Sequence, residues 1–221
     1  MSYKKQYGYQ PGVATLNQKF VVYLENRNGN SDAKSFQPDT LKRLFEAWSR
    51  NDGRSIDVFR ADAASYQYDV IKLVESKVRH FYIGCRNSYV DKYYRQITNW
   101  KETIDHEGVA YQVGSIRIKP FAQRSQAADI TEYRLVVKRR KNKSGQIDIL
   151  TQDDYEYRSI ITNDFDLSAR EAAHLYNQRG AMERVFDVLK NDFGWNNMPY
   201  STLEKNHVFL ILTAIVNNLY Q

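Results

Sequence analysis

Residues 56–85 read IDVFRADAASYQYDVIKLVESKVRHFYIGC and change their hydrophobic period twice. The run Ile56–Ala61 is rich in β-branched and aromatic residues and predicts a strand that closes on Asp62. In Tyr68–Lys77 the aliphatic residues recur at helical spacing, and His80–Cys85 predicts a second strand. A strand, a helix and a strand in this order are typical of an α/β domain with a partly parallel sheet.

The residues on either side extend this alternation. Val13–Leu16 and Phe20–Leu24 predict two short strands, and the second is apolar throughout, as expected for a strand buried on both faces. The sequence 26–32 predicts a turn, 38–50 predicts an amphipathic helix, and Val90–Trp100 predicts a further helix. We therefore predict a first core part that spans residues 1–105.

A β-rich segment follows the first core part. Its strand-like runs are Tyr111–Ile118, Glu132–Val137, Asp148–Leu150 and Tyr157–Ile161. We predict an all-β insertion over 106–166, in which Lys138–Gln146 forms a basic hairpin tip. The last part, 167–221, returns to helical periodicity in Leu167–Phe193 and Leu203–Leu219.

The predicted helix Leu167–Phe193 carries signals for both of its ends. Ser168 and Glu171 have the spacing of a capping box, and Gly194 follows the last turn. Trp195 is expected to pack against Phe193, the alternative being that it stacks on a flipped base.

Composition limits the class of protein. The 221 residues are 42% hydrophobic and 26% charged, which is typical of a globular protein. Cys85 is the one cysteine, so no internal disulfide can form and a reducing cytoplasm is expected. The longest apolar stretch, Val208–Val216, is shorter than the roughly 20 residues of a membrane span. The net charge of +6 favours a polyanionic partner.

Motifs for several other chemistries are missing from the sequence. The four histidines and Cys85 lack zinc-ligand spacing, no Gly-x-Ser-x-Gly motif is present, and no phosphate-binding Gly-x4-Gly-Lys-Ser/Thr motif is present. Zinc chemistry, serine hydrolysis and ATP-driven chemistry are therefore disfavoured.

Candidate chemistry is concentrated on the helix predicted over 167–193. Tyr176, Arg179, Glu183 and Lys190 fall within about 60° of arc at 100° per residue. Apolar residues lie beside them, so we expect these four at the rim of the buried stripe, with Glu183 partly desolvated and fixed in direction. Arginine and lysine bind phosphates, and tyrosine offers a hydroxyl and a stacking face. The alternative is an ordinary solvated helix face.

The spacing Y-x2-R-x3-E-x6-K is more specific than its residue types, because a chance match in such a chain has odds on the order of one in a thousand. Residues 176–194, YNQRGAMERVFDVLKNDFG, resemble the signature of insertion-sequence DDE transposases of the family-4 clade, nearest its 1380-type branch. Phe59–Tyr66 resembles the block that carries the family's second catalytic aspartate, here Asp62. Gly8–Pro11 and Arg27–Asn30 also fit this branch.

The resemblance implies an RNase H-like fold: a mixed five-stranded sheet flanked by helices, with a β insertion before the helix of the catalytic glutamate. It implies Asp62 and Glu183 as catalytic metal ligands and Mg2+ or Mn2+ as the cofactor of a two-metal phosphoryl transfer. Tyr176, Arg179 and Lys190 are then expected to position the terminal phosphates of DNA.

The implied partner is double-stranded DNA at the terminal inverted repeats of an insertion sequence, bound by a homodimer in a synaptic complex in the bacterial cytoplasm, at the nucleoid. The basic residues Lys138, Arg139, Arg140 and Lys141 are expected to contact DNA phosphates. The alternative for this run is a solvated hairpin tip, and no membrane partner is expected.

One departure from the family concerns its first catalytic aspartate, which lies upstream of the block that resembles Gly8–Pro11. Residues 1–24 contain no acidic residue, and Glu25 is the first. We therefore expect an N-terminally truncated fragment that lacks the first strand of the sheet and does not cleave DNA alone. The alternatives are a catalytically inactive DNA-binding or dimerising remnant and a product that does not fold.

Overall fold

The computed structural model describes residues 8–29, 34–51, 53–105, 108–124, 130–142, 147 and 153–221. They form two compact units. The sheet unit comprises the described residues of 53–177, and the helical unit comprises those of 1–52 together with 178–221.

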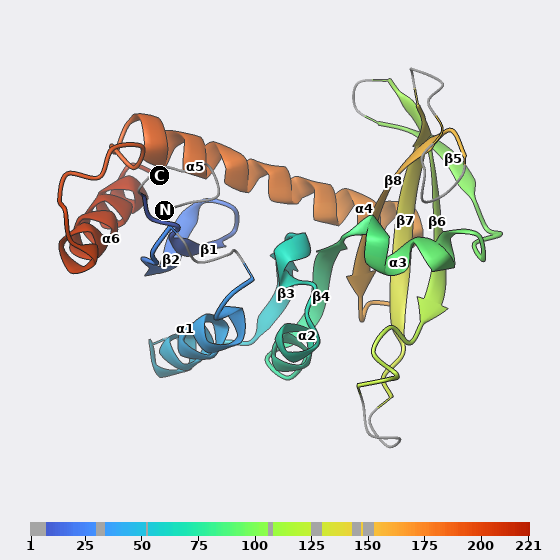
Figure 1. The fold of residues 1–221 in the computed structure, drawn as a ribbon, viewed down its shortest axis with the longest axis horizontal. Coiled ribbons are helices and arrows are strands. Elements are labelled where there is room, and N and C mark those ends of the chain that lie inside the picture. The colour runs from blue at the N-terminus through green and yellow to red at the C-terminus, as the bar shows by residue number, and fades with distance from the viewer. Residues whose placement is uncertain are drawn as a thin grey trace. The chain divides into compact units, whose positions relative to one another are not determined.

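The sheet unit is built on one six-stranded sheet (Figure 1). Its strands are β3 (Ile56–Ala61), β4 (Val78–Cys85), β5 (Lys101–Ile104), β6 (Ala110–Ile118), β7 (Tyr133–Lys141) and β8 (Tyr155–Thr162). They lie in the order β3-β4-β8-β7-β6-β5, in which β3 and β4 are parallel and all other neighbours are antiparallel. The predicted α/β class with a mixed sheet is confirmed, and the architecture is consistent with an RNase H-like fold.

Helices cover both faces of this sheet. On one face α4 (Ala169–Asn177) contributes to a core cluster of Tyr82, Tyr111, Val113, Val136, Ile160, Ala172 and Ala173. On the other face α3 (Asn87–Tyr94) places the Tyr94 ring on the Tyr157 ring, with centroids 4.6 Å apart. Side chains at 157 and 160 point to opposite sides of β8, because successive residues of a strand alternate. The remaining helix, α2 (Tyr68–Glu75), buries the predicted Val70, Ile71 and Val74.

Two predictions for the sheet unit are wrong in detail. The helix expected over Val90–Trp100 begins and ends earlier, because Asn99 Oδ1 accepts a hydrogen bond from Ser115 N at 3.1 Å and holds this segment against β6. β5 escapes prediction because its sequence, Lys-Glu-Thr-Ile, shows no apolar alternation.

The strands predicted for the insertion join the same sheet as β3 and β4. β6, β7 and β8 confirm three of them, and Asp148–Leu150 lies outside the described residues. The division of the chain into 1–105, 106–166 and 167–221 stays a prediction.

The helical unit pairs a β-hairpin with three helices. Its elements are β1 (Gly12–Leu16), β2 (Phe20–Glu25), α1 (Gln37–Asn51), α5 (Ala181–Asn191) and α6 (Leu203–Leu219). Both predicted strands are confirmed, but the expectation that the second is buried on both faces is wrong. Val21 is buried whereas the Val22 residue is 43% exposed. A strand of a two-stranded sheet that packs through one face leaves its other face to water.

The Asn218 side chain of helix α6 forms hydrogen bonds with the backbone of strand β2. Val21 N donates to Asn218 Oδ1 at 2.9 Å, and Asn218 Nδ2 donates to Val21 O at 2.8 Å, so the amide pairs with the backbone as a neighbouring strand would. The core of this unit consists of Val21, Val185, Leu189, Trp195, Leu210 and Ala214. Trp195 also donates from Nε1 to Thr213 Oγ1 at 2.9 Å, and Phe193 packs against the cluster to which Trp195 belongs, whereas direct packing of Trp195 on Phe193 stays a prediction.

The single helix expected over Leu167–Phe193 is divided in the structure. A 3-10 turn, η3 (Gln178–Gly180), separates α4 from α5, and the boundary between the two units lies at the same place. Gly180 favours this interruption, since glycine destabilises a helix interior by about 1 kcal/mol relative to alanine. The predicted capping box is confirmed: Ser168 N donates to Glu171 Oε2 at 2.8 Å and Glu171 N donates to Ser168 Oγ at 3.2 Å.

Candidate active site

Asp62 lies where the parallel strands β3 and β4 end. It follows Ala61, the last residue of β3, and its side chain is exposed. Its Oδ1 accepts a hydrogen bond from Ala64 N at 2.9 Å, so Asp62 caps the 3-10 turn η1 (Ala63–Ser65). In α/β sheets, ligands bind outside the carboxyl ends of the strands, which is where this carboxylate is held.

Tyr176 reaches the same end of the sheet from α4. A Cβ atom built on Gly84 of β4 would lie 2.5 Å from the Tyr176 hydroxyl, 3.2 Å from Ala63 N and 3.5 Å from the carbonyl carbon of Asp62. A side chain at residue 84 therefore has no room, and the phenol occupies the space beside the Asp62–Ala63 peptide. The structure thus brings together two of the predicted site residues that are far apart in the sequence.

A second contact fixes the same turn of α4. Arg60 Nη1 donates to Leu175 O at 2.7 Å, and burial lowers the pKa of the Arg60 guanidinium from its ordinary value. Leu175 and Tyr176 are partly buried against the core cluster of the sheet unit. The end of α4 is therefore anchored to β3 and β4 by a charged hydrogen bond and by packing.

The other three signature residues belong to the helical unit. Arg179 is in η3, and Glu183 and Lys190 are on α5, where both are exposed. Arg179 Nη2 lies 3.7 Å from Glu183 Oε1, and the Glu183 side chain is 72% exposed. Asp62 belongs to the sheet unit and Glu183 to the helical unit, so their joint role as metal ligands stays a prediction.

The expectation that Glu183 is partly desolvated at the rim of the buried stripe is wrong. The core contacts of α5 are centred on Val185 and Leu189, and Phe186 is only partly buried. At 100° per residue, Glu183 lies roughly 120–160° from these two core residues, which turns it outward.

The carboxylates of Asp62 and Glu183 are the candidate ligands for the Mg2+ or Mn2+ that the resemblance implies. Asp62 and Glu183 offer exposed carboxylate oxygens, the hard ligands that Mg2+ and Mn2+ prefer, so the two residues fit such an ion. Within the described ranges, no three His, Cys, Asp or Glu side chains gather closely enough to form a metal-binding group.

The basic run does not form a hairpin tip. Lys138, Arg139, Arg140 and Lys141 are the last residues of strand β7, and 143–146 lie outside the described residues. The prediction is wrong because β7 continues past its apolar residues: Lys138 pairs with Arg158, and Lys141 with Tyr155, in an unbroken ladder to β8. Such long-range pairing leaves no local signal in a run of charged residues.

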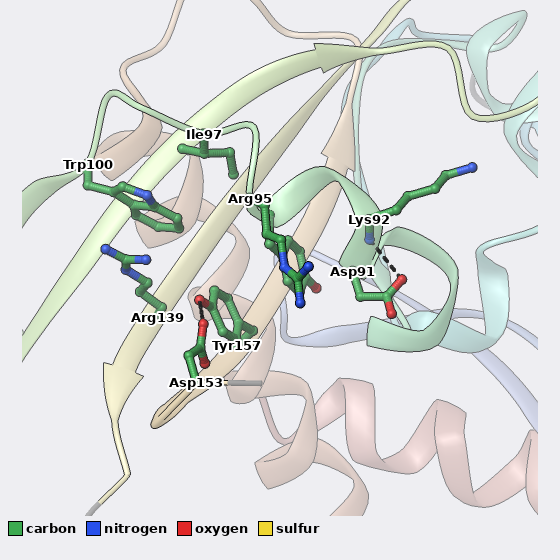
Figure 2. Close-up of a pocket in the computed structure, with 9 residues that line it drawn as sticks. Asp91, Lys92, Arg95, Ile97, Trp100, Arg139, Asp153 and Tyr157 are labelled. Atoms are coloured by element: carbon green, nitrogen blue, oxygen red, sulfur yellow. Dashed lines mark hydrogen bonds between the residues drawn. The ribbon is translucent and has the colours of Figure 1, made fainter. Parts of the chain in front are cut away.

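A polar and aromatic cavity of about 430 Å³ adjoins this end of β7 (Figure 2). Trp100, Arg139 and Tyr157 line it, and the Tyr157 hydroxyl donates to Asp153 Oδ2 at 2.5 Å. The Arg139 guanidinium lies 3.9 Å from the centre of the Trp100 ring. Sequence reasoning missed this cavity because its walls come from α3, the segment before β5, and two strands.

Sequence reasoning also missed a buried carboxylate, Asp164, in the segment that precedes α4. Asp164 is 4% exposed, accepts from the Tyr82 hydroxyl, and accepts at Oδ1 from Asp166 N at 2.8 Å and Leu167 N at 3.2 Å. Burial opposes its ionisation, but the hydrogen bonds from Tyr82, Leu167 and Asp166 prevail and lower the pKa of Asp164 below its ordinary value. Asp164 thereby fixes the chain just before the helix that carries Tyr176.

The mixed sheet flanked by helices, with an exposed acid after β3, is that of an α/β protein and is consistent with an RNase H-like fold. A sequence profile described as "Transposase DDE domain" matches residues 2–219, so the chain belongs to the family of DDE transposases, whose substrate is DNA. No curated protein is significantly similar to the chain. In the part of the chain that the structure describes, no helix has the length and apolar character to cross a bilayer.

Proposed function

We propose that this chain is the catalytic domain of an insertion-sequence transposase of the family-4 clade, nearest the 1380-type branch, in which Asp62 and Glu183 hold divalent cations. The observation that supports it most is the position of the Tyr176 hydroxyl beside the Asp62–Ala63 peptide, at the carboxyl end of β3. Two sequence blocks that resemble the family separately thus lie next to the same residue, Gly84, inside the sheet unit.

The covalent chain links Tyr176 to Glu183. Glu183 is seven positions after Tyr176, which corresponds to a rise of about 10 Å where the chain is helical. The proposal requires Glu183 to come to the strand ends at which Asp62 lies. We expect the two carboxylates to lie roughly 4 to 8 Å apart, the span of a shared metal site.

Each signature residue has a distinct role in this proposal. Mg2+ or Mn2+, when bound, supplies activation of water or a 3′-hydroxyl and stabilisation of the leaving oxygen. Asp62 and Glu183 provide the carboxylate oxygens. Arg179, now 3.7 Å from Glu183, can instead grip a DNA phosphate through two N–H groups, while Lys190 adds a point charge and Tyr176 a hydroxyl donor.

Metal binding gives a direct test. Mn2+ titrations of the whole chain, followed by electron paramagnetic resonance, should show binding that weakens about tenfold or more in Asp62→Asn and in Glu183→Gln, because each removes a ligand charge. Asp57→Asn and Asp187→Asn, exposed acids on β3 and α5, are the matched controls and should bind Mn2+ as the unsubstituted chain does. Equal affinity in all five proteins would contradict the assignment.

Strand cleavage distinguishes the catalytic domain from the alternative, an inactive DNA-binding or dimerising remnant. The proposed pair is one carboxylate short of the three expected in the family, and residues 1–24 hold no acid. Glu25 is already engaged, since Arg43 Nη2 lies 2.7 Å from its Oε1 and Thr40 Oγ1 donates to it at 3.2 Å.

We therefore expect residues 1–221 alone to give no metal-dependent cleavage of terminal-inverted-repeat duplex above Glu183→Ala. A strand that carries an aspartate, fused upstream or added as a peptide, should restore cleavage by two copies in a synaptic complex. Duplex binding without cleavage after this addition would favour the remnant. Cleavage by the unaided chain would show that another carboxylate completes the site.

A further inference from the structure

The basic residues at the end of β7 are divided between two faces of the sheet. Successive side chains of a strand point in opposite directions, so Lys138 and Arg140 share one face, and Arg139 and Lys141 share the other. Lys138 and Arg140 lie on the face of Val136, which belongs to the core cluster beneath α4. Four adjacent cations in the sequence are therefore two separate pairs in space.

The neighbouring strand adds a third cation to the first face. Arg158 of β8 lies directly opposite Lys138, and Glu156 lies directly opposite Arg140. Like charges in directly opposed positions destabilise a sheet, so the Lys138–Arg158 pair favours a bound anion. The Arg158 side chain is 78% exposed and can reach such a partner.

The acids near these cations leave an excess of positive charge. Glu156 is shared, with Oε2 3.2 Å from Arg140 and Oε1 3.2 Å from Arg158. Burial, together with Arg140 and Arg158, lowers the pKa of Lys138, while Asp105 and Glu156 act in the opposite direction. The Lys138 ammonium lies 3.8 Å from the centre of the Tyr111 ring, which directs it along the same face.

Arg139, on the face opposite to Lys138 and Arg140, lies beside Trp100 (Figure 2). Its guanidinium lies between the rings of Trp100 and Tyr155, 3.9 and 4.4 Å from their centres, and its Nε donates to Gln112 Oε1 at 2.8 Å. To reach a phosphate, Arg139 would have to leave two rings and an amide acceptor, whereas Lys138 would have to leave the Tyr111 ring.

We propose that Lys138, Arg140 and Arg158 form one surface that binds the phosphate backbone of duplex DNA, and that Arg139 and Lys141 are not part of it. This inference rests on the proposed function, because the family makes DNA the polyanion. Neighbouring strands are about 4.8 Å apart and alternate residues of a strand about 6.7 Å apart, so two of these cations can reach one phosphate or two successive ones. Contacts of this kind bind any sequence and depend strongly on salt.

Two single substitutions test which grouping is right. Arg158→Gln removes a charge from outside the basic run but on the proposed surface, and Lys141→Gln removes one from inside the run but on the opposite face. Duplex affinity of the whole chain is measured by fluorescence anisotropy at several KCl concentrations, with a terminal-inverted-repeat duplex and a random duplex. Arg158→Gln should reduce the slope of log affinity against log salt by about one, whereas Lys141→Gln should leave it unchanged.

The triple substitution Lys138→Gln, Arg140→Gln and Arg158→Gln should reduce the slope by about three and weaken both duplexes equally, by about tenfold or more. An unchanged melting temperature shows that the variants fold. The inference is overturned if Lys141→Gln reduces the slope as much as Arg158→Gln, if the triple variant keeps the slope, or if only discrimination between the duplexes is lost. If the unsubstituted chain shows no salt-dependent binding of either duplex, the proposed function itself fails.

Discussion

Two residues of the Tyr-Arg-Glu-Lys signature, Tyr176 and Glu183, are held in different ways. Tyr176 packs against the core cluster of the sheet unit, its hydroxyl fills the space left by Gly84, and Arg60 binds the carbonyl of the preceding residue. Glu183 projects from α5 with 72% of its side chain exposed, and Arg179 is 3.7 Å away. The contrast teaches that packing sets the position of Tyr176, whereas Glu183 remains available to a ligand.

The largest effect of a substitution on stability is expected at Asp164, which precedes the helix that carries Tyr176. Asp164→Ala leaves the Tyr82 hydroxyl and the N–H groups of Asp166 and Leu167 without their buried acceptor, which should destabilise the fold by about 3 kcal/mol. Urea unfolding followed by circular dichroism measures the loss. Asp166→Ala, an exposed neighbour, is the control and should change stability by less than about 0.5 kcal/mol. Equal losses would show that the buried carboxylate does not anchor this turn.

The same carboxylate gives the stability a pH dependence. The folded pKa of Asp164 is lowered from 3.8, so its stabilising contribution is present above the unfolded value and is lost as the pH falls through the folded value. Acidification from about pH 5 towards pH 2 should therefore reduce the stability of the unsubstituted chain more than that of Asp164→Asn. Parallel loss in both proteins would assign the acid sensitivity to other groups.

An intermediate effect is expected where Gly84 meets Tyr176. Gly84→Ala introduces a methyl group 2.5 Å from the hydroxyl and should destabilise the fold by about 1–3 kcal/mol. Tyr176→Phe removes the hydroxyl, so the double variant should lose less than the sum of the single losses, with a coupling of at least about 0.5 kcal/mol. Gly8→Ala meets nothing within 4 Å and is the matched control. Additive losses would show that Tyr176 does not depend on Gly84 for its place.

The sequence allows the anchored half of the site to be predicted better than the exposed half. The strand Ile56–Ala61 and the place of Asp62 directly after it are confirmed, and so are the buried residues of α2, whose helical periodicity agrees with their burial. That Tyr176 meets Gly84 could not be predicted, since the contact depends on the path of α4 across the sheet. The site residues as a set stay a prediction, because Asp62 and Glu183 belong to different units.

The errors concern features that distant residues determine. The basic residues 138–141 were expected in a turn, and pairing with β8 makes them a strand. The expected rim position of Glu183 assumed one continuous helix and a core contact nearer to it, whereas the helix is interrupted at Gln178–Gly180 and the core is centred on Val185 and Leu189. Helical periodicity gives the spacing of a face but not the direction in which that face packs.

The smallest effect on stability is expected at Glu183, the exposed residue of the comparison. Glu183→Gln removes the exposed partner of an ion pair whose closest atoms are 3.7 Å apart, and ion pairs at the surface contribute about 0–1 kcal/mol, so the free energy of unfolding should change by less than about 0.5 kcal/mol. Arg179→Gln removes the other partner and should have an effect of the same size. Thermal and urea unfolding of both variants, without divalent cations, measure this. A loss above about 2 kcal/mol in Glu183→Gln would mean that Glu183 is held by contacts beyond Arg179, as firmly as Tyr176 is. A negligible loss, combined with weakened Mn2+ binding in the same variant, is the result expected of a side chain whose direction is set by the cation and not by the fold.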